Sequence, residues 1–455
     1  MKSKLIIALL MLVTVTMGGC SNKPDEPETK EMVLEIDETA ATELAHAFFD
    51  AYIAGDYESA YSYPFEKEME AAFPVPAMKS TADQIEKKYG SFIEKQGEKT
   101  SYSQGYYIVT IGGIHEKKAL AYNVVFNEES QIAGFHYREI DNLDDFFADE
   151  SESVIPVTFG SEAFPLDGTL LYPEGDGPFP AVVLVHGSGP NDRDETAYDN
   201  KPFKDIAEGL ASQGIAVLRY DKRTYTHAAK FQDKEIVQNM TAYDEVIDDA
   251  RYAVDFLETQ KDIEQIYILG HSLGGNQAPR IAEGRDDIAG LIIMGGYVTP
   301  LQNLMLYQYE YLYGLEVNSD EETKELYEKQ ISLAKDAVAL INSDELKPDT
   351  DPNLTFGVAA PYWMDLRDYD PTAVAKELDI PLLILQGGRD YQVPPAEFEL
   401  WQEKLGDKSK YKFYESLNHL FIAGEGTPSP EEYKIKGNVS DEVIDDIAAW
   451  VLASE

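Results

Sequence analysis

Cysteine is almost absent from this sequence, since Cys20 is the only one in 455 residues. A single thiol excludes a framework of disulfide bonds within the chain and a zinc site built from several cysteines. Histidine is scarce as well, with seven residues, and no His-x-x-x-His or similar spacing of metal ligands occurs. We therefore expect neither a metal nor another cofactor.

Basic residues are also few. There are 38 Lys and Arg against 83 Asp and Glu, which gives a formal net charge of −45 at pH 7. Such an acidic surface repels nucleic acid, so no nucleic-acid partner is expected, and it disfavours electrostatic binding to anionic lipid headgroups. Apolar residues make up 44% of the chain, enough for packed cores, and the length indicates at least two domains.

The hydrophobic run at the N-terminus is short. Two lysines precede an apolar stretch at residues 5–17, which is followed by two glycines and Cys20. This layout predicts a signal peptide over residues 1–20 rather than a membrane span. It resembles a bacterial lipoprotein signal, although Met17 stands where leucine is more usual. We expect lipid on Cys20 to anchor the protein to the cell membrane outside the cytoplasm; the alternatives are a secreted protein and an uncleaved anchor.

The region after the signal divides into a tether and a small domain. Residues 21–36 are polar and rich in Pro, Glu and Lys, which is typical of a flexible tether. Residues 37–147 read as helices followed by strands and predict a small α+β domain without a catalytic constellation. Its expected helices cover 39–61, with a break at Gly55-Asp56, and 82–92, and its expected strands cover 105–111, 118–126 and 131–138.

Residues 153–455 alternate strands and helices, as a parallel sheet requires. The expected strands cover 181–185, 215–220, 266–269, 290–294, 382–385 and 411–414. The alternation stops between about 298 and 370, where helical patterns rich in tyrosine predict a cap inserted over the sheet. Tyr362 and Trp363 in this insertion are candidates to line a substrate pocket, or alternatively to pack the insertion onto the core.

A G-x-S-x-G motif, Gly270 to Gly274, follows an apolar strand and precedes a helical pattern. This context predicts a nucleophile elbow with Ser272 on a sharp turn. Asp390 and His419 each come just after a predicted strand, and the order serine, acid, histidine is that of α/β-hydrolases. A serine hydroxyl needs an adjacent histidine base, which a carboxylate orients. We expect Ser272, His419 and Asp390 to form a catalytic triad, with Asp368 and Asp370 as rival acids.

The remaining polar groups of the predicted site are backbone N–H groups. The apolar strand at 181–185 ends in His186-Gly187-Ser188-Gly189-Pro190. In this fold one oxyanion donor is the N–H after the nucleophile, here Leu273, and the other lies in the loop after the third strand, where we select Ser188. His186 and His271 are expected to be packing residues.

Taken together, residues 153–455 resemble bacterial α/β-hydrolases of the serine aminopeptidase-like and dienelactone hydrolase-like group. The resemblance rests on the segments DGTL at 167–170, HGSGPND at 186–192, LRYDKR at 218–223, GHSLGG at 270–275, YWMDL at 362–366 and QGGRDYQVP at 386–394. It implies hydrolysis of small-molecule acyl esters by the α/β-hydrolase fold with a helical cap. The N-terminal domain resembles nuclear transport factor-like cones or the small domains of unknown function that precede such hydrolases.

Other functions stay open at this point. The same fold hosts thioesterases, peptidases and acyltransferases, so the fold alone does not select the substrate. A peptidase for free amino ends would need a carboxylate to bind the ammonium group, for which Glu310, Asp365 and Asp368 are candidates. A surface-binding lipoprotein with an inactive hydrolase domain is the alternative outside enzymes.

Overall fold

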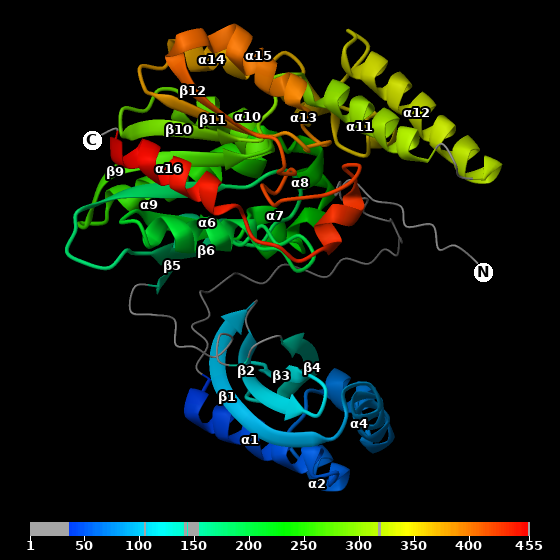
Figure 1. The fold of residues 1–455 in the computed structure, drawn as a ribbon. Helices are drawn as coiled ribbons and strands as arrows, with labels where there is room; N and C mark the ends of the chain where they lie inside the picture. Colours follow the sequence, from blue (N-terminus) through cyan, green and yellow to red (C-terminus); the bar gives the residue numbers. More distant parts are fainter. Residues whose placement is uncertain (1–35, 104–105, 141–142, 144–153, 317–319, 454–455) are drawn as a thin grey trace. The chain divides into compact units, whose positions relative to one another are not determined.

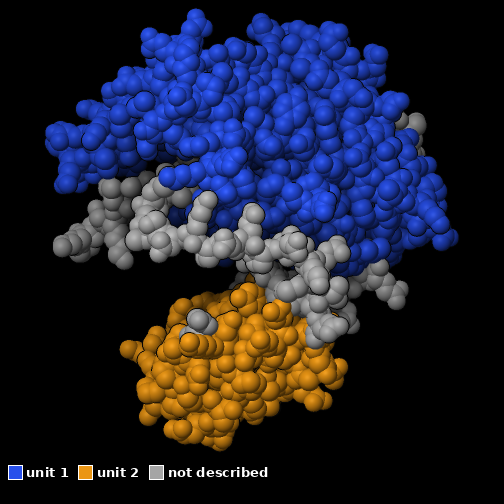
Figure 2. All heavy atoms as spheres, turned by 180° about the vertical axis from the view of Figure 1, so that it is seen from behind, with its two compact units in different colours: residues 1–18, 152–455 blue, residues 19–151 orange. Residues whose placement is uncertain are grey.

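The computed structural model describes residues 36–103, 106–140, 143, 154–316 and 320–453. The expected signal peptide with Cys20 and most of the tether lie outside the described residues. Contacts divide the described residues into one unit within 19–151 and a second unit within 152–455, coloured orange and blue in Figure 2. Across the described residues, no helix is long and apolar enough to cross a membrane.

The N-terminal unit combines helices with an antiparallel sheet of order β1-β2-β3-β4 (Figure 1). Asp37 caps the first helix by accepting a hydrogen bond from the N–H of Ala40, and Gly55, with φ of 77°, follows its end. The core is aromatic: the rings of Phe48 and Phe135 meet edge to face at 5.1 Å. The elements are α1 Glu38–Ile53, α2 Tyr57–Tyr61, α3 Lys67–Ala72, α4 Val75–Tyr89, β1 Phe92–Ser103, β2 Tyr106–His115, β3 Ala119–Phe126 and β4 Ile132–Ile140.

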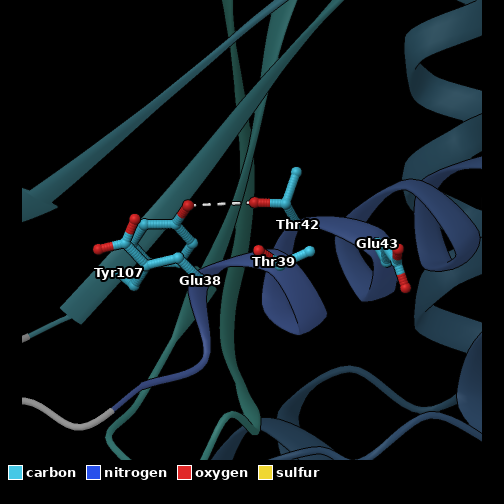
Figure 3. A pocket seen from close by; sticks show the side chains of 5 residues that line it. All are labelled: Glu38, Thr39, Thr42, Glu43 and Tyr107. Atoms are coloured by element: carbon cyan, nitrogen blue, oxygen red, sulfur yellow. Dashed lines mark hydrogen bonds between the residues drawn. The ribbon is translucent and has the colours of Figure 1, made fainter.

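A hollow in this unit lies between the start of α1 and β2 (Figure 3). The hydroxyl groups of Thr42 and Tyr107 are 3.1 Å apart across it. Its other lining residues are Glu38, Thr39 and Glu43. Two carboxylates beside hydroxyl groups supply no base-activated nucleophile, so we assign no chemistry to the hollow.

The second unit is built on an eight-stranded sheet of order β12-β11-β10-β9-β7-β8-β6-β5. Six strands, from β12 to β8 in this order, run parallel, while β5 and β6 form an antiparallel hairpin at the edge. The strands are β5 Val154–Ser161, β6 Phe164–Leu171, β7 Phe179–Val185, β8 Ala216–Tyr220, β9 Ile263–His271, β10 Ile288–Met294, β11 Leu382–Gly387 and β12 Ser409–Tyr414.

Helices cover both faces of this sheet, because successive strand residues point to opposite sides. Val183 and Val185 pack in a core with α9, α10, α14 and α15, while Val182 and Leu184 pack in a core with α6 and α16. The helices are α6 Pro202–Ala211, α7 Arg223–Thr226, α8 Lys234–Asn239, α9 Asp248–Glu258, α10 Leu273–Ala282, α14 Pro371–Glu377, α15 Pro395–Leu405 and α16 Asp441–Ala453. A π-helical turn, Tyr243–Ile247, leads into α9.

A helical insertion separates β10 from α14. It contains α11 Leu301–Leu315, α12 Glu321–Ile341 and α13 Ala360–Leu366, with α11 and α12 side by side in Figure 1. Gln302 near the start of α11 donates a hydrogen bond of 2.7 Å to Asn342 at the end of α12, so the two helices are antiparallel. The mostly parallel sheet, the helices on both faces and this insertion confirm the α/β-hydrolase fold that the sequence predicts.

Candidate active site

Ser272 lies at the turn between β9 and α10 in a backbone conformation that side chains rarely adopt. Its φ is 53° and its ψ is −113°, and its N–H donates to the carbonyl oxygen of Met294 at 3.0 Å. The turn is too tight for side chains at its glycines. A Cβ on Gly270 would lie 2.2 Å from the carbonyl oxygen of Gly274, and one on Gly274 would lie 2.3 Å from that of Val185. This strained turn presents the serine at the carboxyl end of the strand.

Asp390 and His419 form a buried pair. They follow β11 and β12, and their exposed fractions are 2% and 5%. Nδ1 of His419 donates to Oδ2 of Asp390 over 2.6 Å, while Oδ1 of Asp390 accepts from the N–H groups of Gln392 at 2.9 Å and Val393 at 2.8 Å. Because Nδ1 carries the proton in this bond, Nε2 of the neutral ring is free to accept one.

His419 contacts His271, the residue that precedes Ser272 in the elbow. The ring of His271 lies 4.5 Å from the ring of His419 and donates from Nε2 to its carbonyl oxygen at 2.9 Å. Among the described residues, no hydrogen bond joins the Ser272 hydroxyl to His419. Such bonds are often loose in free enzymes and tighten when substrate binds, so the arrangement is compatible with a serine–histidine pair.

The two rival acids have other roles. Oδ1 of Asp370 accepts from the N–H groups of Thr372 and Ala373 and caps the N-terminus of α14. Asp368 is exposed and lies 3.4 Å from the guanidinium of Arg367. Neither contacts His419, which leaves Asp390 as its carboxylate partner.

The two candidate oxyanion donors come from the elbow itself and from the loop after β7. Leu273 is the first residue of α10, and an N–H at that position has no acceptor within its helix. Ser188 is exposed in the loop after β7. This loop comes close to the nucleophile, since a Cβ on Gly187 would lie 3.1 Å from Cβ of Ser272. Both donors thus belong to segments that border Ser272.

A buried ion pair that the sequence did not indicate connects these segments. Oε1 of Glu195 accepts the N–H of Gly187 at 2.7 Å, and its Oε2 pairs with Nδ1 of His271 at 2.8 Å. Burial alone would lower the pKa of His271, but the Glu195 carboxylate raises it above its usual value. Burial alone would raise the pKa of Glu195, but the His271 imidazolium holds it below its usual value. His271 is therefore an ion-pair partner as well as a packing residue.

His186 is also buried, but its ring is neutral, unlike that of His271. Its Nε2 donates to the carbonyl oxygen of Asp192 at 3.0 Å, and its ring lies 5.1 Å from that of Phe203. Burial lowers the pKa of His186 to about 4, so the ring is neutral at neutral pH. This is the packing role expected for it.

The two pocket candidates of the insertion are both buried. Trp363 is fully buried and donates from Nε1 to the carbonyl oxygen of Thr355 at 2.9 Å. Tyr362 is 5% exposed and donates to Oε2 of Glu245 at 2.7 Å. Burial favours the packing role that the sequence left open, above all for Trp363.

Other tyrosines of the insertion lie beside the loop that carries Asp390, the candidate triad acid. The ring of Tyr311 on α11 stacks on that of Tyr391, the residue after Asp390, with a centroid distance of 5.4 Å. Tyr307, one turn earlier on α11, contacts Tyr311 at 6.1 Å and is 36% exposed. These rings place an aromatic surface next to the Asp390 loop.

One group of carboxylates has the spacing of a metal site within the described residues: Asp255, Glu258 and Asp287. The guanidinium of Arg285 pairs with Asp255 at 2.7 Å and also with Asp287. An ion-pair network therefore accounts for the group, and we assign no metal to it.

Comparison with known families gives two matches. The model of the family described as serine aminopeptidase, S33, matches residues 178–425, and that of a protein family of unknown function, DUF3887, matches residues 45–135. The chain is 36% identical to esterase EstD of Thermotoga maritima over 415 residues, which cover 90% of this chain and 94% of that protein. It is 28% identical to cutinase 2 of Thermobifida cellulosilytica over 134 residues, 30% of this chain and 45% of that protein.

Among solved structures, Est1E of Butyrivibrio proteoclasticus matches at 16% identity with a TM-score of 0.44, covering 66% of this chain and 99% of that chain. An esterase of Pyrococcus furiosus matches at 15% identity with a TM-score of 0.41, covering 66% and 90%.

The fold and the elbow define a hydrolase of the α/β class. Within that class, the match over residues 178–425 shows that the chain belongs to the serine aminopeptidase S33 family. The likeness of the N-terminal unit to nuclear transport factor-like cones stays a prediction.

Proposed function

We propose that this protein hydrolyses esters of small carboxylic acids through an acyl-enzyme on Ser272. Oγ of Ser272 attacks the carbonyl carbon while Nε2 of His419 takes its proton, and His419 then protonates the leaving alcohol. Asp390 stabilises the imidazolium, and the N–H groups of Leu273 and Ser188 bind the oxyanion. Water then attacks the acyl-enzyme by the same route and releases the acid.

The observation that carries this proposal is the buried Asp390–His419 pair together with Ser272, which has a strained backbone conformation. A strained residue persists only where the surrounding structure holds it, and such positions cluster at active sites. A domain that only binds a ligand would need neither the strain nor the oriented histidine. The geometry thus supports catalysis over the non-catalytic alternative.

The coarse class of the enzyme is not in question. The chain is a carboxylic ester hydrolase, as supported by 36% identity to an esterase over nine tenths of its length. The proposal adds the triad, the acyl-enzyme and the small acyl substrate to this class. Because Tyr307 and Tyr311 lie beside the Asp390 loop, we propose that they contribute to the substrate-binding surface.

The pairing of three carboxylates supports esters over peptides with a free amino end. Asp365 accepts from Arg280 at 2.8 and 3.1 Å. Glu310 lies 3.0 Å from Lys335, and Asp368 pairs with Arg367. Each candidate for binding a substrate ammonium group already has a cationic partner.

The test is labelling of Ser272 by a fluorophosphonate together with turnover of acetyl, butyryl and octanoyl esters, thioesters and aminoacyl amides. Ser272→Ala should lose the label and at least about 10⁴-fold in kcat. Ser212→Ala, at the exposed end of α6, is the matched serine control and should keep both. Ester turnover by Ser272→Ala at the wild-type rate would refute the nucleophile, and faster cleavage of aminoacyl amides than of esters would favour the peptidase.

We also propose that lipid on Cys20 anchors the enzyme to the outer face of the bacterial cell membrane. The supporting feature is the short apolar run that ends in two glycines and the single cysteine. Labelled palmitate should enter the wild-type protein in a bacterial host and should not enter Cys20→Ser. Processed, unlabelled wild-type protein in the medium would show secretion instead.

A further inference from the structure

The peptide group between Gly187 and Ser188 is fixed by a buried cation. Nζ of Lys222 donates to the carbonyl oxygen of Gly187 at 2.8 Å, and the Lys222 side chain is only 2% exposed. The N–H of Gly187 is held as well, by Glu195. The residue that precedes the candidate oxyanion donor is therefore bound at both of its polar backbone groups.

Lys222 is itself compensated inside the core. Its ammonium group pairs with Oε1 of Glu245 at 2.5 Å, and the Tyr362 hydroxyl donates to the other oxygen of that carboxylate. A buried charge is costly unless it is paired and hydrogen-bonded, and here both partners meet that condition. The backbone N–H of Lys222 also donates to the carbonyl oxygen of Asn191 at 3.0 Å, which ties Lys222 to the same loop.

The carbonyl oxygen of Gly187 and the N–H of Ser188 belong to one planar peptide group. In a trans peptide these two groups point in opposite directions, so a bond that fixes the oxygen also fixes the direction of the N–H. Hydrogen bonds that involve a charged group are stronger than neutral ones, and linked bonds polarise one another. The Lys222 ammonium withdraws electron density through the carbonyl and makes the Ser188 N–H a stronger donor.

We propose that Lys222 is a positioning residue that orients and polarises the oxyanion-binding peptide of Ser188. The inference rests on the proposed function, in which this N–H binds the oxyanion. Lys222 touches neither substrate nor the reacting atoms in this proposal. Its effect is confined to the tetrahedral intermediate, where negative charge develops on the substrate oxygen.

The neighbouring residue offers a matched control. Arg223 is also buried and pairs with buried Asp249 through Nε at 2.7 Å and Nη2 at 2.5 Å. Within the described part of the chain, no hydrogen bond joins it to Gly187. Lys222→Met and Arg223→Met therefore both remove a buried cation from a carboxylate. Only Lys222→Met removes a hydrogen bond to Gly187, in the loop that carries Ser188.

The experiment compares kcat and KM for a butyryl ester in the full chain. We expect Lys222→Met to lower kcat about 10- to 100-fold relative to Arg223→Met, less than the loss of a direct oxyanion donor, with KM nearly unchanged. The inhibition constant of an alkyl trifluoromethyl ketone, which forms a tetrahedral oxyanion on the serine, should rise by a similar factor. Equal kcat values in the two variants, or a change in KM alone, would overturn the inference.

A second variant covers the case in which Lys222→Met does not fold. Lys222→Gln keeps a donor for the Gly187 carbonyl without the charge, so its kcat should fall below that of wild type, but by less than the roughly 10- to 100-fold expected for Lys222→Met. A wild-type kcat in a folded Lys222→Gln would overturn the polarising role. Activity of Ser272→Ala would instead overturn the proposed function itself, so the two failures are distinguishable.

Discussion

At the scale of single residues, the two oxygens of Asp390 have separate tasks. Oδ1 binds two backbone N–H groups of its own loop, and Oδ2 binds Nδ1 of His419. The loop bonds fix the carboxylate before the histidine contacts it. In the proposed mechanism, the proton on Nδ1 leaves Nε2 to act as the base for Ser272.

Replacing this carboxylate by an amide tests its role. In Asp390→Asn the amide oxygen can keep the bonds to the loop, so the NH₂ group faces His419 and donates to Nδ1. The proton then sits on Nε2, which cannot accept the serine proton, and we expect kcat to fall roughly 10⁴-fold with little change in melting temperature. Asp370→Asn, which still caps α14, should keep its activity; the reverse pattern in an ester assay would identify Asp370 as the acid.

His186 gives a pH dependence of stability. Its pKa of about 4 in the folded protein lies below the unfolded value of 6.5, so the stability of the neutral ring is present above pH 6.5 and is lost as the pH falls toward 4. The loss amounts to about 3 kcal/mol. The difference between the free energies of unfolding of wild type and His186→Gln, measured in urea from pH 7.5 to 4, should change by that amount in disfavour of wild type. Parallel curves would contradict the buried neutral state.

At the scale of elements, the sequence predicted those with a clear apolar pattern. The helical patterns expected between about 298 and 370 include α11 and α12, and the strand expected at 181–185 is the greater part of β7. The sequence did not predict β1, because its residues 93–101 are all exposed and show no apolar alternation. This strand pairs with β2 alone and lies at the edge of its sheet, where pairing needs no buried side chains.

For the candidate site too, the sequence predicted some residues and not others. Motif and chain order selected Ser272, Asp390 and His419, because these positions follow strands. Glu195 and Lys222 could not be selected, since they meet His271 and Gly187 from positions 76 and 35 residues away. The available signal was that a polar residue at a buried position, such as His271, requires a polar partner.

The elbow makes a prediction about glycine. A Cβ on Gly274 would lie 2.3 Å from the carbonyl oxygen of Val185, which is backbone and cannot move aside. We expect Gly274→Ala to lower the free energy of unfolding by about 3 kcal/mol or more and to reduce activity. At Gly314 in α11 a Cβ meets nothing within 4 Å, so Gly314→Ala should stabilise by about 0.5–1 kcal/mol. Equal effects of the two substitutions in urea denaturation would show that the elbow relaxes.

At the scale of the whole molecule, the two units have separate cores. The core of the N-terminal unit draws its buried residues from positions 41–132, and the two large cores of the hydrolase unit draw theirs from positions 166–451. Ser272, Asp390 and His419, as well as the two candidate oxyanion donors, all belong to the second set of positions. Each unit thus meets the condition for folding by itself.

This separation predicts that residues 152–455 expressed alone fold and hydrolyse short esters. We expect kcat/KM for a butyryl ester within about threefold of the full chain, since domains with their own cores fold independently and the proposed machinery is complete in this unit. Calorimetry of the full chain should resolve two transitions, one of which matches the isolated unit. Ser272→Ala in the isolated unit controls for contaminating esterases. A folded but inactive unit would show that the N-terminal residues contribute directly to the site, and it would assign a catalytic role to a region in which the sequence indicates none.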